Sequence, residues 1–143
     1  MRQLRFLISL ILLSLFTTAK AQDAASMKAF VDRFYTEWGS ENMLEYDYLK
    51  QHATPNLLRF LADSYDYDCE GECLATWLFF YEGGGDVCCS NSRQIEVRDD
   101  QHVLVKIKYD NYEYDVLLKV IWDGNQYKID GLQQERSEYI SEN

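Results

Sequence analysis

The spacing of apolar residues changes once along this 143-residue chain, and that change limits the folds it can adopt more than any other feature. Between positions 27 and 65, apolar residues recur three and four positions apart, which is the spacing of one helical face. From position 95 to position 130 they alternate with polar residues, which is the period of a strand buried on one side. Helices followed by antiparallel strands predict an α+β domain, in which three helices pack on a sheet of about four strands.

Three helices are predicted from this spacing and from capping signals at their ends. Gly39 ends the first helix, and Ser40 can cap a short second helix. Thr54 supplies a capping side chain for the third helix, and Pro55 suits the first position of that helix. The residues expected to face the core are Met27, Phe30, Val31, Phe34, Tyr35 and Trp38 in the first helix, Met43, Leu44, Tyr46 and Leu49 in the second, and Leu57, Leu58, Leu61, Ala62 and Tyr65 in the third.

Alternating segments predict the strands, and turn residues separate them. Asp110-Asn111 and Asp123-Gly124-Asn125 stand where hairpin turns are needed, and the second group contains residues that accept a positive φ. The segment from Gln126 to Asp130 is predicted to close the sheet. The alternating apolar residues are Ile95 and Val97, then Val103, Val105, Ile107 and Tyr109, and finally Val116, Leu118, Val120 and Trp122.

The first 21 residues have the three parts of a secretory signal peptide. Arg2 and Arg5 make the start basic, and the apolar run from Phe6 to Phe16 is too short to span a bilayer. The segment Ala19-Lys20-Ala21 has the small-x-small pattern of a cleavage site. We therefore predict that residues 22–143 form a single α+β domain that is periplasmic or secreted and does not insert into a membrane after cleavage.

The predicted mature domain is strongly acidic. The whole chain has a formal charge of −10, and removal of Arg2, Arg5 and Lys20 leaves 11 basic and 24 acidic side chains, or −13. Such a balance argues against nucleic acid and anionic membranes, because lysine and arginine supply most of the affinity for phosphate groups. A basic exported protein or enzyme is the partner that this charge favours.

Four cysteines, Cys69, Cys73, Cys88 and Cys89, predict a disulfide framework in an oxidising compartment. A bond between the neighbours Cys88 and Cys89 would strain disulfide geometry, so we expect Cys69 and Cys73 to pair crosswise with them in either order. A four-thiolate zinc site is the alternative, although this spacing is not a standard zinc pattern. The chain lacks the C-x-x-C motif that redox catalysis would favour.

An ordered set of residues along the chain carries a resemblance to a known superfamily. They are Phe34-Tyr35, Tyr46 and Leu49, Thr54-Pro55-Asn56-Leu57-Leu58, Tyr65-Asp66-Tyr67-Asp68, Trp77-Leu78 and Tyr127-Lys128-Ile129-Asp130. From Met27 to Gly131 the chain resembles small secreted bacterial domains of unknown function in the nuclear transport factor 2-like superfamily. The resemblance implies a cone in which a curved antiparallel sheet wraps the helices and leaves a pocket at the open end. It implies no reaction, because this superfamily contains enzymes, binding modules and inhibitors.

The segment from position 66 to position 81 combines acidic and aromatic residues. With Gly71, its first carboxylates match part of a calcium loop, but Trp77 stands where the loop needs a bidentate glutamate, so a solvated acidic turn without metal is favoured. The aromatic residues that follow can pack in the core at alternate positions or form an exposed patch for a partner. We assign partner binding to Asp66, Asp68, Glu70, Glu72, Trp77, Phe79 and Tyr81.

Signals for catalysis are sparse, and we assign no catalytic residue, metal or cofactor. The chain has neither H-E-x-x-H nor G-x-S-x-G, and its two histidines, His52 and His102, are expected in surface or capping roles. The residues favour an exported, non-catalytic protein-binding module, most concretely an acidic inhibitor or immunity-type protein that covers a basic partner. One alternative is a periplasmic binder of small ligands that uses the apolar pocket of the cone. The other is an enzyme with an Asp/Tyr pocket, for which the candidates are Asp110, Tyr112, Tyr114 and Asp115.

Overall fold

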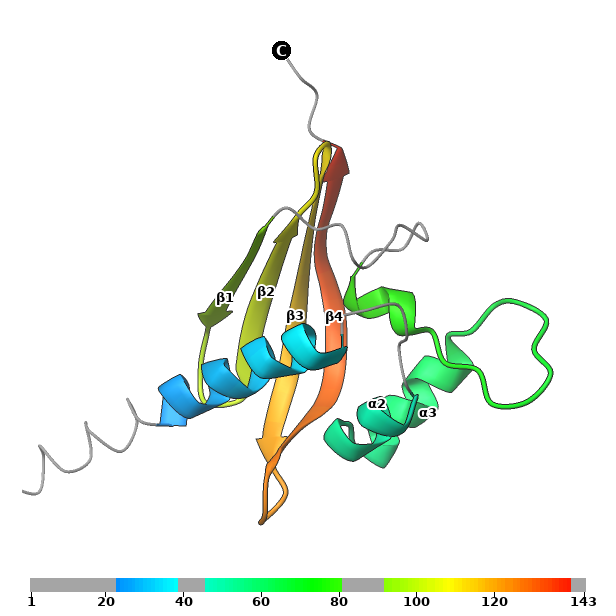
Figure 1. Cartoon of the computed structure of the whole chain (residues 1–143), viewed down its shortest axis with the longest axis horizontal. Coiled ribbons are helices and arrows are strands. Elements are labelled where there is room, and N and C mark those ends of the chain that lie inside the picture. The colour runs from blue at the N-terminus through cyan, green and yellow to red at the C-terminus, as the bar shows by residue number, and fades with distance from the viewer. Residues whose placement is uncertain (1–22, 39–45, 81–91, 140–143) are drawn as a thin grey trace, which may run out of the picture.

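A computed structural model describes residues 23–38, 46–80 and 92–139, and these form the predicted α+β architecture of three helices and a four-stranded antiparallel sheet (Figure 1). The predicted signal peptide, the predicted cap Ser40 and the first half of the predicted second helix lie outside the described residues. So do Tyr81, Cys88 and Cys89.

The helices occur in the predicted order, and among the described residues the predicted faces are buried or partly buried, with one exception. The N-terminal helix covers residues 23–38, α2 covers Tyr46–His52 and α3 covers Pro55–Asp63. The Leu57 amide donates a hydrogen bond to Thr54 Oγ1 at 3.3 Å, so Thr54 is the N-cap of α3, with Pro55 at the first position. Ala62, which was expected to face the core, is exposed, because the buried face of α3 is narrower than predicted.

The four strands form a meander in the order β1-β2-β3-β4. They are β1 (Ser92–Val97), β2 (His102–Lys108), β3 (Tyr112–Trp122) and β4 (Tyr127–Tyr139). The turn between β3 and β4 is the predicted one: the Asp123 carboxylate accepts hydrogen bonds from the amides of Asn125 and Gln126, and Gly124 has a φ of +100°. β4 runs nine residues beyond the predicted end at Asp130 and pairs with β3 along its whole length.

One hydrophobic core lies between the helices and the sheet. Every second side chain of β3 is buried, from Tyr112 to Val120, and these meet the buried faces of the helices. The short helix η1 (Thr76–Phe79) and the residue that follows it add two rings to this core, since Phe79 is 0% exposed and Phe80 is 5% exposed. The assignment of Phe79 to a partner-binding surface is therefore wrong: its ring packs edge-on against Trp38, with the centroids 5.0 Å apart.

Polar contacts join the helices to the sheet. The Thr54 amide donates to the Ile129 carbonyl at 2.9 Å, and the Thr54 hydroxyl donates to the Asp130 carboxylate at 2.8 Å. Lys119 donates to the second oxygen of the same carboxylate at 2.9 Å. At the other edge of the sheet, Arg93 of β1 forms an ion pair with Asp32 of the N-terminal helix. In Figure 1 this helix lies across the sheet.

Candidate functional site

The chain between α3 and η1 makes a long excursion, residues 64–75, which we call the acidic loop; it projects away from the sheet (Figure 1). Its end is anchored, because Leu74 and Ala75 are buried and the Ala75 amide donates to the Leu61 carbonyl at 2.9 Å. Positions 66–72 are all exposed. Gly71 has a φ of +114°, a backbone conformation that favours glycine.

A disulfide bond between Cys69 and Cys73 closes the outer part of the acidic loop. The expected crosswise pairing with Cys88 and Cys89 is therefore wrong for these two cysteines. Two cysteines only four positions apart can form this bond because the loop reverses direction at Gly71. The reversal brings their Cα atoms to 6.2 Å, inside the usual range for a disulfide.

The carboxylates of the acidic loop are in two different states. Glu72 forms an ion pair with Lys50 of α2 at 2.5 Å, and this hydrogen bond raises the pKa of Lys50. Asp66, Asp68 and Glu70 are exposed and form no ion pair with any residue that the structure describes. Three of the four predicted acidic residues therefore leave negative charge available to a partner.

Three aromatic rings lie beside these carboxylates. The centroids of Tyr65, Tyr67 and Trp77 are 5.3–5.9 Å apart in each pair, and we call them the aromatic trio. The Tyr67 side chain is 70% exposed, whereas Trp77 is half-buried. The sequence prediction included Trp77 but not the two tyrosines that lie beside it, although their positions on either side of Asp66 were a usable signal.

The part of the chain that the structure describes contains no group of three or more His, Cys, Asp or Glu residues that could hold a metal ion. Asp66, Asp68 and Glu70 of the partial calcium motif are exposed, and Glu72, which follows the motif's glycine, forms an ion pair with Lys50. The acidic loop therefore presents charge and aromatic surface but no metal cage within the described residues.

Two of the residues considered for an Asp/Tyr pocket, Tyr114 and Asp115, lie on opposite faces of β3. Tyr114 points into the core and its hydroxyl donates to the Leu78 carbonyl at 2.7 Å. Asp115 is the next residue of β3 and lies on the opposite face, beside Arg136 of β4. Burial raises the pKa of Asp115, and the positive charge of Arg136 opposes that shift. Adjacent strand residues point to opposite faces, so this pair cannot share a proton in one pocket.

Both histidines make local polar contacts. His52 Nδ1 lies 2.8 Å from the Tyr48 carbonyl, and its ring stacks on the Tyr48 ring with centroids 4.2 Å apart. His102, at the start of β2, contacts the Asp99 carboxylate at 2.9 Å. Hydrogen bonds from the Gln101 amide, and then from His102, lower the pKa of Asp99.

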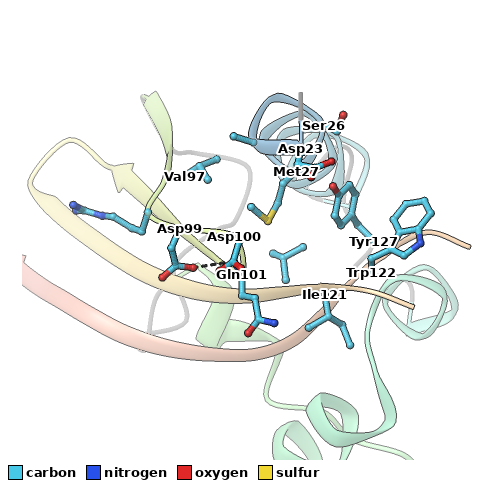
Figure 2. A pocket seen from close by; sticks show the side chains of 13 residues that line it. Asp23, Ser26, Met27, Val97, Asp99, Asp100, Gln101, Ile121, Trp122 and Tyr127 are labelled. Carbon is cyan, nitrogen blue, oxygen red and sulfur yellow. Dashed lines mark hydrogen bonds between the residues drawn. The ribbon is translucent and has the colours of Figure 1, made fainter. Parts of the chain in front are cut away.

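A cleft lies at the end of the sheet that carries the β1–β2 and β3–β4 turns (Figure 2). This open cleft, of about 1190 Å³, lies beside the start of the N-terminal helix, and none of its lining residues was predicted as a site residue. Its lining combines apolar, aromatic and acidic side chains, which include Met27, Val120, Trp122, Tyr127, Asp99 and Asp100. The signal for it was an aromatic residue, Trp122, at the last position of an alternating run.

Comparison with known proteins identifies no relative: no family model, no curated protein and no solved structure matches the chain. Within the described ranges, no helix has the length and apolar character needed to cross a membrane.

Proposed function

We propose that this chain is an exported, non-catalytic protein-binding module whose acidic loop covers a basic surface of its partner, as an inhibitor or immunity-type protein does. One observation carries the proposal: Asp66, Asp68 and Glu70 are exposed without a described cationic partner, beside an aromatic trio with an exposed tyrosine. The partner chemistry is accordingly a cluster of lysine and arginine side chains around a groove or cleft.

The two components of this surface would contribute differently to binding. The carboxylates attract a basic surface over distance and raise the association rate. Aromatic side chains supply the buried contact area on which most interface energy depends. The Cys69–Cys73 bond restricts the loop before binding, which reduces the entropy lost on association.

Export and the detailed shape of the fold belong to the same proposal. The basic, apolar and small-residue parts of residues 1–21 support secretion into the periplasm or the medium. The meander of four strands after three helices supports the cone of the nuclear transport factor 2-like superfamily.

The proposal is tested by using three forms of the mature protein as bait for the exported proteins of the source organism. The forms are wild type, Asp66→Asn/Glu70→Gln, and the matched control Asp100→Asn/Glu135→Gln, which has the same change in charge on exposed residues away from the acidic loop. We expect wild type and control to retain the same basic protein at low salt, and the loop variant to retain at least about fivefold less. Equal retention by all three forms, or retention of no basic protein, would contradict the proposal.

A small-ligand binder is the second candidate function, and the cleft at the end of the sheet is the observation that favours it. Open, partly apolar hollows with a few polar groups are the usual form of such sites. The two candidate sites are formed by different residues, because Asp100 lines the cleft and Asp66 does not.

A further inference from the structure

The cleft at the end of the sheet has an apolar floor and an aromatic wall. Met27 of the N-terminal helix is 2% exposed and Val120 of β3 is 1% exposed, so both form a closed base. Trp122 is 59% exposed, and its ring meets the Tyr127 ring edge-on with centroids 5.1 Å apart. Figure 2 shows these two rings on the side of the cleft opposite Asp99. The wall is therefore an aromatic surface in contact with solvent.

The charge on the lining is negative. Asp23, Asp99 and Asp100 contribute carboxylates, and the only base among the described lining residues, Arg98, forms an ion pair with Glu96 at 3.1 Å. The Asp99 carboxylate is engaged within the β1–β2 turn: it accepts hydrogen bonds from the amides of Gln101 and His102 and contacts His102 Nδ1 at 2.9 Å, and these contacts keep its pKa below its usual value.

Two further observations concern the other carboxylates of the lining. The Asp23 carboxylate is close enough to the Tyr127 hydroxyl to raise the pKa of Tyr127, an effect to which burial contributes more. Asp100 is exposed and forms no ion pair or hydrogen bond with any described residue. The exposed indole face attracts a positive group through its π electrons, and the Asp100 carboxylate, which no described cation compensates, attracts it through charge.

We propose that this cleft is a binding site for a small organic cation: an ammonium group on an alkyl or arylalkyl body. The ammonium group lies on the carboxylate side of the cleft, beside Asp100, and the apolar body covers Met27 and Val120 and reaches the Trp122 ring. This site is separate from the acidic loop and does not depend on the protein-binding function proposed above.

The test uses three probes of nearly equal size and different charge: 2-phenylethylamine, 2-phenylethanol and phenylacetate. Each is titrated into the ¹⁵N-labelled mature protein, and the indole N–H signals of Trp122 and Trp77 are followed by NMR. Trp77 is the internal control, because it belongs to the aromatic trio and not to the cleft. We expect the amine to shift the Trp122 signal saturably, the alcohol to bind at least about fivefold more weakly, and the acid to cause no saturable shift.

Two pairs of variants test the assignment of residues. Trp122→Leu removes the aromatic face, and Asp100→Asn removes one carboxylate. Each substitution should weaken binding of the amine about threefold to tenfold, as measured from the NMR shift of the Gln101 amide signal. The matched controls, Tyr139→Leu and Glu135→Gln, change an exposed aromatic and an exposed acid at the other end of the sheet and should leave binding unchanged.

Equal affinity for the amine and the alcohol would overturn the cation site. So would a saturable shift at Trp77 in place of Trp122, or an equal loss of binding in the cleft variants and their controls. None of these results bears on retention of a basic protein by the acidic loop, so failure of either proposal can be recognised separately.

Discussion

Phe79 and Trp77 lie two positions apart in η1, and substitution of each should separate the core from the proposed binding surface. Phe79 is 0% exposed, and its ring lies 5.0 Å from Trp38 and 5.5 Å from Phe34, measured between centroids. Phe79→Ala should therefore lower the free energy of unfolding by about 3–5 kcal/mol, the usual cost of deleting a fully buried aromatic ring. Phe79→Leu keeps most of the volume but loses the ring contacts, and should cost about 1–1.5 kcal/mol.

Urea denaturation of the mature protein, followed by circular dichroism, measures these costs. For a slope of about 2 kcal/mol per molar urea, Phe79→Leu should lower the midpoint by roughly 0.5–0.8 M without changing the slope. Trp77→Ala removes a half-buried ring of the aromatic trio and should cost less than about 1.5 kcal/mol. A wild-type midpoint for Phe79→Leu, or a larger loss for Trp77→Ala than for Phe79→Ala, would refute the position assigned to η1.

Two further substitutions test the contacts that hold the helices, η1 and the sheet together. Tyr114→Phe removes the hydrogen bond to the Leu78 carbonyl and should lower the free energy of unfolding by about 1–2 kcal/mol in the same urea experiment. An unchanged free energy of unfolding would contradict that hydrogen bond. Asp130→Asn tests the carboxylate whose pKa is lowered mainly by its hydrogen bond from Lys119 and next by that from Thr54. Because the folded-state pKa lies below the unfolded value of about 3.9, the stabilisation is complete above that pH and is lost as the pH falls through the folded-state pKa. The difference in unfolding free energy between wild type and Asp130→Asn should thus be constant near neutrality and shrink below about pH 4; a constant difference into strong acid would contradict this role.

Much of the fold was predictable because burial on one face imposes a period on the sequence. The face from Met27 to Trp38 is buried as expected, and so are alternate residues of β3. Local chemistry was equally informative at Thr54 and Pro55, where a cap and a proline mark the start of α3. The length of β4 was not predictable, because beyond Leu132 this strand is solvent-exposed and its residues carry no apolar alternation.

The candidate site was predictable in composition but not in geometry. The sequence places acidic and aromatic residues together, yet only the turn of η1 decides that Phe79 is buried and Trp77 is half-buried. The Cys69–Cys73 bond depends on a chain reversal at Gly71 that residue spacing alone does not reveal. Trp122 continues the alternation of core-facing residues in β3, but it lies at the end of the strand, beyond the residues that pack on the core, and its side chain is therefore exposed.

The dependence of the association rate constant on salt, measured for the retained partner by surface plasmon resonance, tests the central claim most directly. Wild type and Asp100→Asn/Glu135→Gln should associate rapidly at low ionic strength and progressively more slowly as salt screens the acidic loop. Asp66→Asn/Glu70→Gln should associate more slowly at low salt and show a shallower dependence. An association rate that changes neither with salt nor with the charge of the acidic loop would contradict the proposal that this loop recognises a basic partner.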